Sequence, residues 1–400
     1  MKRIPYPHLK PYSDYKPSGV KWLGDVPAHW EVRRLKRICC LAYGDSLSSE
    51  DRVDGNVPVY GSNGQVGFHS CPNTNGQCLI IGRKGSFGKV QYSFKPVFAI
   101  DTTFFVDSRY TNANIRWLYY LLGWLQLDAV SKDSAVPGLN REDAYQYIGF
   151  YPPFAEQTAI VRYLDQADER IRRYVSSRER LIELLEEYRQ AVIHHAVTHG
   201  LDPDVRLKPS GVEWLGDVPA HWEVRRLKTL CSMKSGEGIT EMSIEPAGEY
   251  PVYGGNGLRG YTSNYTHDGN YVLIGRQGAL CGNVHIARGR FWASEHAVVA
   301  SLSAGYVLEW FAAILDVMNL NQYSIAAAQP GLAVERVLNL SLPVPSPREQ
   351  AHIARYIERE TAAIDAAIDR ARREIELLGE YRTRLIADVV TGKVDVREGE

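Results

Sequence analysis

The stretch KPSGVKWLGDVPAHWEVRRLKRIC at residues 16–39 determines how this chain is organised, because it returns almost unchanged as KPSGVEWLGDVPAHWEVRRLKTLC at residues 208–231. Twenty-one of the 24 positions are identical. The period of about 190 residues is far longer than the roughly 20–45 residues of a solenoid repeat. We therefore predict two copies of one module, arranged as a pseudo-symmetric, two-lobed protein.

Matching segments continue in register beyond this 24-residue repeat. VPVYGSNGQVG at 57–67 matches YPVYGGNGLRG at 250–260, and LIIGRKGSFGKV at 79–90 matches VLIGRQGALCGNV at 272–284. Much of each copy is rich in Gly, Tyr, Trp and β-branched residues, with short apolar runs such as CLII at 78–81. Gly, Asn and Ser separate those runs, and this pattern predicts short strands joined by tight turns.

One apolar segment in each copy has the character of a core helix. These segments are NIRWLYYLLGWLQL at 114–127 and VLEWFAAILDVMNL at 307–320. We expect each helix to pack on the sheet of its own copy. Trp30 and Trp222, which occupy the same position of the 24-residue repeat, are expected to anchor the fold rather than to stack on bases.

Each copy then continues with a highly charged stretch in which apolar residues recur alternately every three and four positions. A 3.5-residue period sustained over about 40 residues is typical of a coiled coil. The apolar positions are Ile160, Leu164, Ala167, Ile171, Tyr174, Leu181, Leu185, Tyr188 and Val192 in the first copy, and Ile353, Ile357, Ile364, Ile368, Ala371, Ile375, Leu378, Leu385 and Val389 in the second. Both helices are expected to start after a proline-rich segment, at 149–157 and 343–350.

The order globule, long helix, globule, long helix requires the two helices to run antiparallel. The predicted fold class is α+β, with two pseudo-twofold-related α/β domains separated by two long antiparallel coiled-coil helices. The tail VTGKVDVR at 390–397 resembles the linker VTHGLDPDVR at 197–206, so the C-terminus is expected to return to the first globule. The predicted boundaries are 1–157 for the first globule, 158–205 for the first helix and linker, 206–349 for the second globule, and 350–400 for the second helix and tail.

The composition narrows the possible functions. The net charge is −1, with 44% hydrophobic and 23% charged residues, as in a globular protein. No run of about 18 apolar residues occurs, so no membrane-spanning helix is expected, and the basic N-terminus lacks the apolar stretch of a signal peptide. The six cysteines show no paired spacing, which favours reduced thiols and a cytoplasmic location. Any DNA-binding surface would have to be a local patch, with further positive charge supplied by partners.

Two segments superficially suggest catalysis. YPPF at 151–154 resembles the loop with which adenine-N6 methyltransferases hold a flipped base, but Tyr151 stands where that loop needs Asp, Asn or Ser. GRKGSFGK at 82–89 resembles a phosphate-binding loop, but its spacing is one residue too long and Val90 replaces the final Ser or Thr. We therefore interpret the first as a helix-start joint and the second as a turn. No catalytic residue, metal site or cofactor is expected.

Taken together, these motifs resemble the specificity subunit of Type I restriction–modification enzymes over essentially the whole chain. The resemblance rests on the doubled WLGDVPAHWEVRRLK, YGxNG and IGRxG segments, the PPxAEQ-type helix start and the two heptad helices. The second helix start, PSPREQ, lacks the double proline. The family implies two target-recognition domains that each bind one half of a split site in double-stranded DNA. It also implies helices that space the halves and dock two methyltransferase subunits, restriction–translocase subunits that join the complex, and a chain that catalyses nothing itself.

The candidate DNA contacts lie in or near glycine-rich turns. Glycine lets a backbone approach its partner closely, and Arg, Lys and amide side chains hydrogen-bond phosphates or base edges. The candidates are Arg83, Lys84, Ser86, Lys89, Ser62, Asn63, Gln65, Lys132 and Ser134 in the first copy, and Arg276, Gln277, Asn256, Arg259 and Gln329 in the second. The alternative for the turns is a plain hairpin with solvated charges.

Segments that differ between the copies are where two different half-sites can be distinguished. Residues 43–77 and 235–270 are therefore better specificity candidates than the 24-residue repeat, which is scaffold, partner-docking surface or a recent duplication. Two other functions stay open. One is a structural coiled-coil protein without DNA binding. The other is a fused methyltransferase–specificity chain, for which 400 residues leave no room for a cofactor domain.

Overall fold

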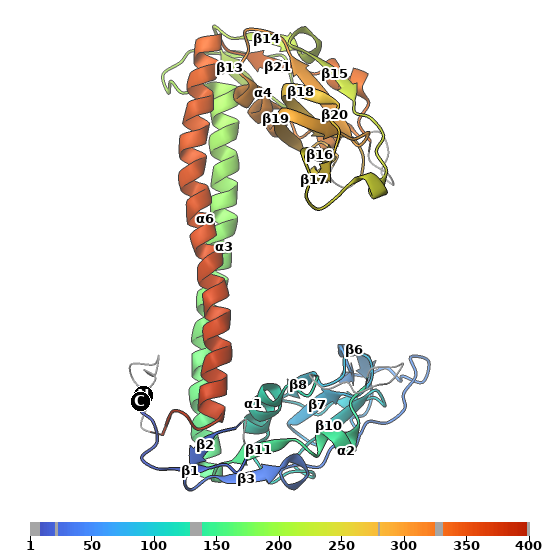
Figure 1. The fold of residues 1–400 in the computed structure, drawn as a ribbon, viewed down its shortest axis with the longest axis vertical. Coiled ribbons are helices and arrows are strands. Elements are labelled where there is room, and N and C mark those ends of the chain that lie inside the picture. Colours follow the sequence, from blue (N-terminus) through green and yellow to red (C-terminus); the bar gives the residue numbers. More distant parts are fainter. Residues whose placement is uncertain (1–8, 21–22, 129–137, 279–280, 325–330, 398–400) are drawn as a thin grey trace. The chain divides into compact units, whose positions relative to one another are not determined.

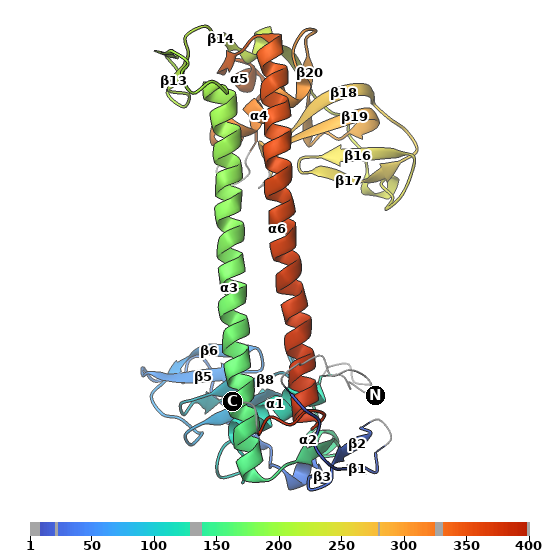
Figure 2. The ribbon, with the colours of Figure 1, turned by 90° about the vertical axis from the view of Figure 1, so that its left-hand side faces the viewer.

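The computed structural model describes residues 9–20, 23–128, 138–278, 281–324 and 331–397 (Figures 1 and 2). The chain divides into two compact units. The first unit comprises Met1–Ser177 and Glu374–Glu400, and the second unit comprises Arg178–Arg373. Both boundaries fall inside the two long helices, α3 (Phe154–His199) and α6 (Pro347–Val390), so each helix contributes one half to each unit. None of the described helices is long and apolar enough to cross a membrane.

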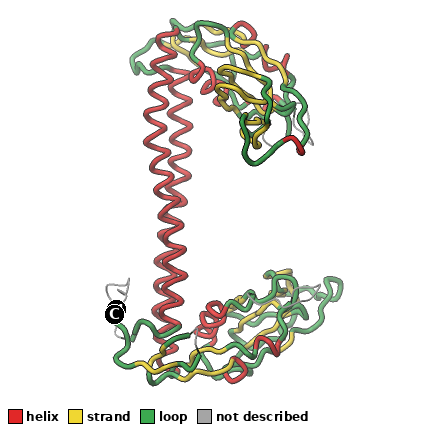
Figure 3. The backbone as a smooth tube through the Cα atoms, in the orientation of Figure 1, coloured by secondary structure: helices red, strands yellow, loops and turns green. Residues whose placement is uncertain are grey.

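The described residues of the first unit form two separate sheets and two strand pairs. The strands are drawn in yellow in Figure 3. The four-stranded sheet has the order β4-β10-β7-β8, the three-stranded sheet has the order β6-β5-β9, and β1 pairs with β2 and β3 with β11. The strands are β1 (Tyr15–Pro17), β2 (Asp25–Pro27), β3 (Glu31–Arg34), β4 (Ala42–Tyr43), β5 (Val57–Gly61), β6 (Gly64–His69), β7 (Cys78–Gly82), β8 (Val90–Ser93), β9 (Phe98–Ala99), β10 (Thr103–Val106) and β11 (Ile148–Tyr151). The helices preceding α3 are α1 (Ile115–Leu125) and α2 (Arg141–Ala144).

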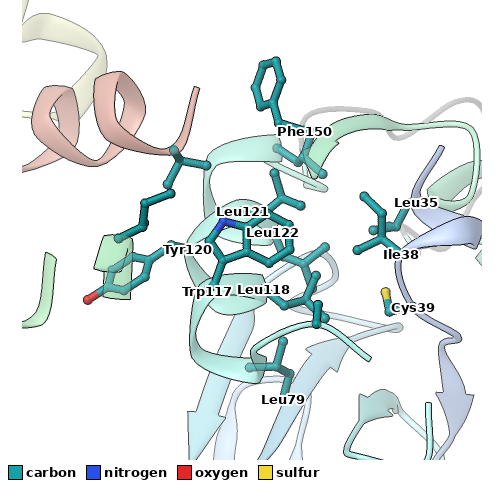
Figure 4. Close-up of a cluster of buried hydrophobic side chains, with 14 of the residues drawn as sticks. Leu35, Ile38, Cys39, Leu79, Trp117, Leu118, Tyr120, Leu121, Leu122 and Phe150 are labelled. Carbon is teal, nitrogen blue, oxygen red and sulfur yellow. The ribbon is translucent and has the colours of Figure 1, made fainter. Parts of the chain in front are cut away.

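Helix α1 is the predicted core helix of the first unit. The side chain of Asn114 caps its start by accepting hydrogen bonds from the backbone N–H groups of Arg116 and Trp117 at 2.9 and 3.1 Å. Trp117 is completely buried and lies with its helical neighbours among residues of the sheet and of the strand before α3 (Figure 4). The apolar periodicity thus predicted this helix correctly, because a helix that buries one face must repeat its apolar residues at the helical period.

The second unit contains one six-stranded sheet of order β15-β20-β18-β19-β16-β17 and the pairs β12–β13 and β14–β21. Its strands are β12 (Leu207–Pro209), β13 (Asp217–Pro219), β14 (Glu223–Arg226), β15 (Cys231–Ser235), β16 (Tyr250–Gly254), β17 (Gly257–Thr262), β18 (His267–Gly275), β19 (Val284–Ala293), β20 (Ala297–Leu302) and β21 (Ser341–Val344). Its shorter helices are α4 (Leu308–Val317) and α5 (Val334–Leu338). Helix α4 is the second predicted core helix, and its Trp310 is completely buried like Trp117.

Each half of the long helices packs against the other helix within its own unit, and the pairing is antiparallel. In the first unit Arg382 of α6 pairs with Asp168 of α3, and the Tyr174 hydroxyl donates to Glu374 at 2.9 Å. In the second unit the pairs are Arg372–Glu186 and Arg189–Asp365, both at 3.0 Å. As the residue number rises on one helix, it therefore falls on its partner, which confirms the predicted direction.

Two details of the helix prediction need correction. Helix α3 starts at Phe154 and α6 at Pro347, slightly before the predicted 158 and 350. The first turn of α3 directly follows Pro153, and that of α6 begins on Pro347, since proline is tolerated at the first helical position. Most predicted seam positions are buried or half-buried, but Tyr174 and Tyr188 are 42% and 59% exposed. The hydroxyl of Tyr174 bonds to Glu374 at the edge of the helix pair, which accounts for its exposure.

The C-terminal tail returns to the first unit, as the sequence predicted. Val394 and Val396 are buried in its core, and Asp395 N donates to Lys10 O at 2.8 Å. Gly392 has a φ of +71° and packs against Trp30. In the second unit Gly200, with a φ of +80°, packs against Trp222 in the same way. The tail therefore occupies the same position against the first repeat as the linker does against the second.

Candidate nucleic-acid interface

The 24-residue repeat forms a joint between each sheet domain and the long helix that follows it. Strand β3 pairs with β11, directly before α3, and β14 pairs with β21, directly before α6. Trp30 and Trp222 are 0% and 2% exposed, which confirms that they anchor the fold. Tyr151 of the YPPF segment lies on β11, so this segment is the helix-start joint that the sequence predicted.

A buried glutamine connects each long helix to the core helix of its unit. Gln157 donates to Pro152 O at 2.9 Å and accepts from Asn114 N at 2.8 Å. Gln350 donates to Pro345 O at 2.9 Å and accepts from the backbone N–H at the start of α4, also at 2.9 Å. Both side chains are completely buried. The glutamine therefore holds the sheet domain and the long helix in one orientation in both units.

A histidine of the repeat contacts the glutamate beside each of these glutamines. His29 lies 2.7 Å from Glu156, and His221 lies 2.6 Å from Glu349. Burial by itself would raise the pKa of Glu349, but hydrogen bonds from His221, Ser346 and Trp222 outweigh it and lower that pKa to about 2. Because the same contacts occur in both units, they support the scaffold interpretation of the repeat.

The candidate loops of the first unit meet at the ends of β5 and β7. The YGSNG hairpin joins β5 to β6, and the turn after β7 is closed by Gly82 N donating to Lys89 O at 2.9 Å. The Ser86 hydroxyl donates to Asn63 at 3.2 Å across the two loops. A Cβ added at Gly82 would lie 3.3 Å from the Cβ of Ser62, so the loops are in close contact. Ser62, Asn63, Arg83, Lys84 and Ser86 are thereby brought to one surface.

Arg83 is held in this surface by its backbone and by its side chain. Its N–H donates to Thr102 O at 2.9 Å, and its carbonyl accepts from Leu139 N at 2.8 Å. Its Nη1 donates to Asp101 O at 2.9 Å, and its guanidinium lies 5.1 Å from the centroid of the Tyr43 ring. The guanidinium is therefore oriented in the absence of any ligand.

Two other candidates of the first unit lie apart from this surface or at its margin. Lys89 faces a hollow of about 820 Å³ between α1 and the last turns of α6, together with Tyr119 and Arg382. Gln65 is exposed on β6, beyond the hairpin turn, and its amide lies 3.5 Å from Gly67 O. Lys132 and Ser134 lie outside the described residues.

The second unit assembles its candidates in the same place. Asn256, Arg259 and Gln277 line one hollow of about 400 Å³ with His296. Asn283 donates to Asn256 at 2.8 Å, as Ser86 does to Asn63. Arg276 is fixed by its backbone like Arg83, with N–H to His296 O at 2.8 Å and its carbonyl accepting from Leu332 N at 2.9 Å. Gln329 lies outside the described residues.

Sequence reasoning missed several residues beside these turns. Tyr43 is 47% exposed, and Arg141 at the start of α2 lies over its ring. In the second unit His285 and His296 stand beside the turn, and burial lowers the pKa of His285, opposed by the charge of Asp316. Tyr43 could have been found, because it begins the variable segment 43–77. Arg141 follows the repeated Pro-Gly-Leu segment (137–139 and 330–332), but Val334 takes its place in the second copy, and nothing in the sequence links it to Tyr43.

Comparisons with known proteins identify the family. The profile described as "Type I restriction modification DNA specificity domain" matches residues 27–178 and 219–377. The Type I restriction enzyme EcoprrI specificity subunit of Escherichia coli is 45% identical over 139 residues, which are 34% of this chain and 35% of that protein. The alignment thus spans about a third of that relative.

Two longer alignments cover most of the chain. The Type I restriction enzyme MjaVIII specificity subunit of Methanocaldococcus jannaschii is 22% identical over 315 residues, 70% of each chain. A solved structure concerned with complex assembly and conformational transition of the type I R-M system matches with a TM-score of 0.70 and 13% identity, over 91% of this chain and 98% of that one. This likeness concerns the fold. On the strength of the two profile matches, the chain belongs to the Type I restriction modification DNA specificity family and carries two copies of its domain.

Proposed function

We propose that this chain is the DNA-recognising subunit of a Type I restriction–modification complex and has no catalytic activity of its own. Residues 1–157 and 206–349 are the proposed target-recognition domains. Each binds one half of a split, asymmetric site in double-stranded DNA. Residues 158–205 and 350–400 provide the helices that set the spacer between the half-sites. The chain requires no cofactor and works in the cytoplasm, where the DNA is.

One observation carries this proposal: the two units present the same pair of loops on the same scaffold with different side chains. Arg83-Lys84 in the first unit corresponds to Arg276-Gln277 in the second. In both units the turn is joined to the neighbouring hairpin by a side-chain hydrogen bond. A shared scaffold with varied hydrogen-bonding groups, and a turn one residue longer in the second unit, suits two domains that recognise different sequences.

The proposed protein partners are two methyltransferase subunits, docked on the long helices, and restriction–translocase subunits that join through the complex. Both helices expose many charged side chains outside their shared seam, which leaves surface for such docking. Purified alone, the chain should neither bind S-adenosylmethionine nor methylate DNA. Methylation by the lone chain would instead indicate a fused enzyme, and partner capture without DNA binding would indicate a structural coiled-coil protein.

The decisive experiment exchanges one recognition domain at a time. Residues 43–150 are replaced by those of another specificity subunit, and the complex is assembled with its methyltransferase subunits. Mapping of the methylated adenines should show one half of the site changed and the other intact. Exchange of the equivalent residues 235–343 is the matched control and should change the opposite half. If either exchange alters both halves, the domains do not act independently and the proposal is wrong.

A second experiment tests the helices as a spacer. An insertion of four residues between Val197 and Arg206 should lengthen the preferred spacer while both half-sites stay the same. The same insertion at the exposed turn of Gly305 is the control and should leave the spacer unchanged. Proline at Leu181 should break α3 at a cost of about 3 kcal/mol or more and reduce partner docking. Methylation is measured on DNA sites that differ only in spacer length. An unchanged preference after the linker insertion, with activity retained, would show that another element sets the spacing.

A further inference from the structure

Two arginines of the first unit lie over one exposed tyrosine beside the candidate loops. The guanidinium carbons of Arg83 and Arg141 lie 5.1 and 4.9 Å from the centroid of the Tyr43 ring. We propose that Arg83, Tyr43 and Arg141 form a preformed binding site for a DNA backbone phosphate at the first half-site. This inference rests on the proposed function and assigns the site its ligand chemistry.

The first argument is charge balance. Six other arginines that lie over aromatic rings each hydrogen-bond to a carboxylate. These pairs are Arg33–Glu31, Arg109–Asp107, Arg116–Asp165 and Arg397–Asp395 in the first unit, and Arg290–Asp268 and Arg359–Glu360 in the second. Within the described ranges the side chain of Arg83 has only the carbonyl of Asp101 as a hydrogen-bond partner, and the buried Nε of Arg141 has none. Arg141 forms only a long ion pair of 3.7 Å with the exposed carboxylate of its chain neighbour Glu142.

The second argument concerns the consequence of that arrangement. Two positive groups on one ring repel each other, and the ring offsets this only in part. An external anion between or beside them would relieve the repulsion, and guanidinium groups match phosphate oxygens in geometry. The turn lets an anion approach closely, because Gly85, with a φ of +72°, has no side chain there. The preceding residue, Lys84, is exposed. DNA supplies such an anion at every nucleotide.

The third argument comes from the second unit, whose described residues contain no counterpart of this stack. Ser235 occupies the position that Tyr43 has in the first unit. In both units the next residue is a glycine, Gly44 or Gly236, which packs against backbone carbonyls. Val334 stands in the place of Arg141. Among the described residues the Arg276 side chain has no hydrogen bond, ion pair or ring contact. The proposed phosphate site therefore belongs to the first half-site alone, and Tyr43 is a positioning residue for Arg83.

The test measures how salt concentration changes DNA binding by the complex of this chain with its methyltransferase subunits. Arg83→Gln and Arg141→Gln should each reduce the slope of log K against log salt by about one, with equal weakening on matched and mismatched half-sites. Tyr43→Ser should weaken binding about 2- to 5-fold, the range of an exposed cation–π contact, and Tyr43→Phe should restore it. Arg33→Gln is the matched control, because that stacked arginine is already neutralised, and it should leave the slope unchanged.

Each other outcome overturns the inference. If Arg83→Gln abolishes preference at one base pair and keeps the slope, Arg83 recognises a base and not a phosphate. If both arginine variants keep slope and affinity, the stack is not a DNA contact. If Tyr43→Phe is as weak as Tyr43→Ser, the ring does not position Arg83. These outcomes leave the proposed function intact, since the wild-type complex still binds its site, whereas a wild-type complex without sequence-specific binding would refute the proposed function itself.

Discussion

The first unit divides its strands between a four-stranded and a three-stranded sheet, whereas the second unit joins the equivalent strands into one six-stranded sheet. The difference arises at one strand. Residues of β19 correspond to β8 and β9 together, and Pro96 stands where Arg290 continues β19. Proline lacks an N–H for the ladder, so a strand tends to end there. Both arrangements keep the same parallel pairing of β5 with β9 and of β16 with β19.

The two units agree where the fold is anchored and differ where DNA is proposed to bind. Trp117 and Trp310, Gln157 and Gln350, and the paired strands of the 24-residue repeat make the same contacts in both. The differences lie in the sheet edge and in the loops. A module can therefore change its recognition surface while its connection to the long helix stays fixed, because the two involve different residues.

The largest expected effect tests whether the two cores are equivalent. Trp117→Ala and Trp310→Ala should each destabilise their own unit by about 3–5 kcal/mol, because both side chains are completely buried. Hydrogen exchange of the full chain, followed by mass spectrometry, would locate the loss. Exchange that rises in the unaltered unit as much as in the altered one would contradict independent cores.

The next effect tests the joint. Gln157→Ala and Gln350→Ala should each cost about 1–3 kcal/mol, because a buried backbone N–H and a buried carbonyl lose their partners. Urea unfolding of the full chain measures the loss. Gln166→Ala, at an exposed position of α3, is the control and should change stability by no more than about 0.5 kcal/mol. A loss in only one of the two glutamine variants would show that the joints are not equivalent.

A smaller effect tests why β8 and β9 are separate strands in the first unit, whereas β19 is continuous in the second. Arg290→Pro should cost about 1 kcal/mol more than Arg290→Ala, because both remove the ion pair with Asp268 but only proline interrupts the strand. Pro96→Ala should change stability by less than about 0.5 kcal/mol. In the first unit the side chains of Thr74 and Asn73 already bind the backbone N–H groups of Val97 and Ala99, at 2.7 and 2.8 Å. Thermal unfolding measures all three variants, and a large gain from Pro96→Ala would mean that proline alone separates the sheets.

The smallest effect is a pH dependence of the second joint. The pKa of Glu349 is lowered from 4.5 to about 2 in the folded chain. Its contribution to stability is therefore fully present above about pH 4.5 and is lost as the pH falls toward 2. Its side chain is 35% exposed, so solvent screening limits this contribution to about 1 kcal/mol or less. Glu349→Gln should flatten the stability profile between these pH values in urea titrations. An unchanged profile would show that His221 and Trp222 do not stabilise the carboxylate.

Sequence patterns were sufficient for most of the architecture and for part of the candidate site. The repeat predicted two modules, the heptads predicted two long helices, and the order of modules and helices predicted that these helices run antiparallel. The glycine-rich turns correctly indicated a surface at which Asn63 meets Ser86 and Asn256 meets Asn283. They did not indicate that Lys89 faces another hollow. Gly88, directly before Lys89, packs against the backbone of Leu127 and Asp128, which follow α1, and such a contact between distant segments cannot be predicted from the turn motif.

Sequence alone determined that the chain has two copies of one module, where each long helix lies, and that the tail returns to the first copy. The first and third features follow from the identity of segments about 193 residues apart, and the second follows from the periodicity of residues close together in the chain. Only the tertiary structure decided that β8 and β9 separate while β19 continues, and that Tyr43, Arg83 and Arg141 share one surface. Tyr43 lies on β4, Arg83 in the turn after β7 and Arg141 on α2. Their proximity depends on how these segments pack in space. Contacts between distant segments leave no periodic trace in a single sequence.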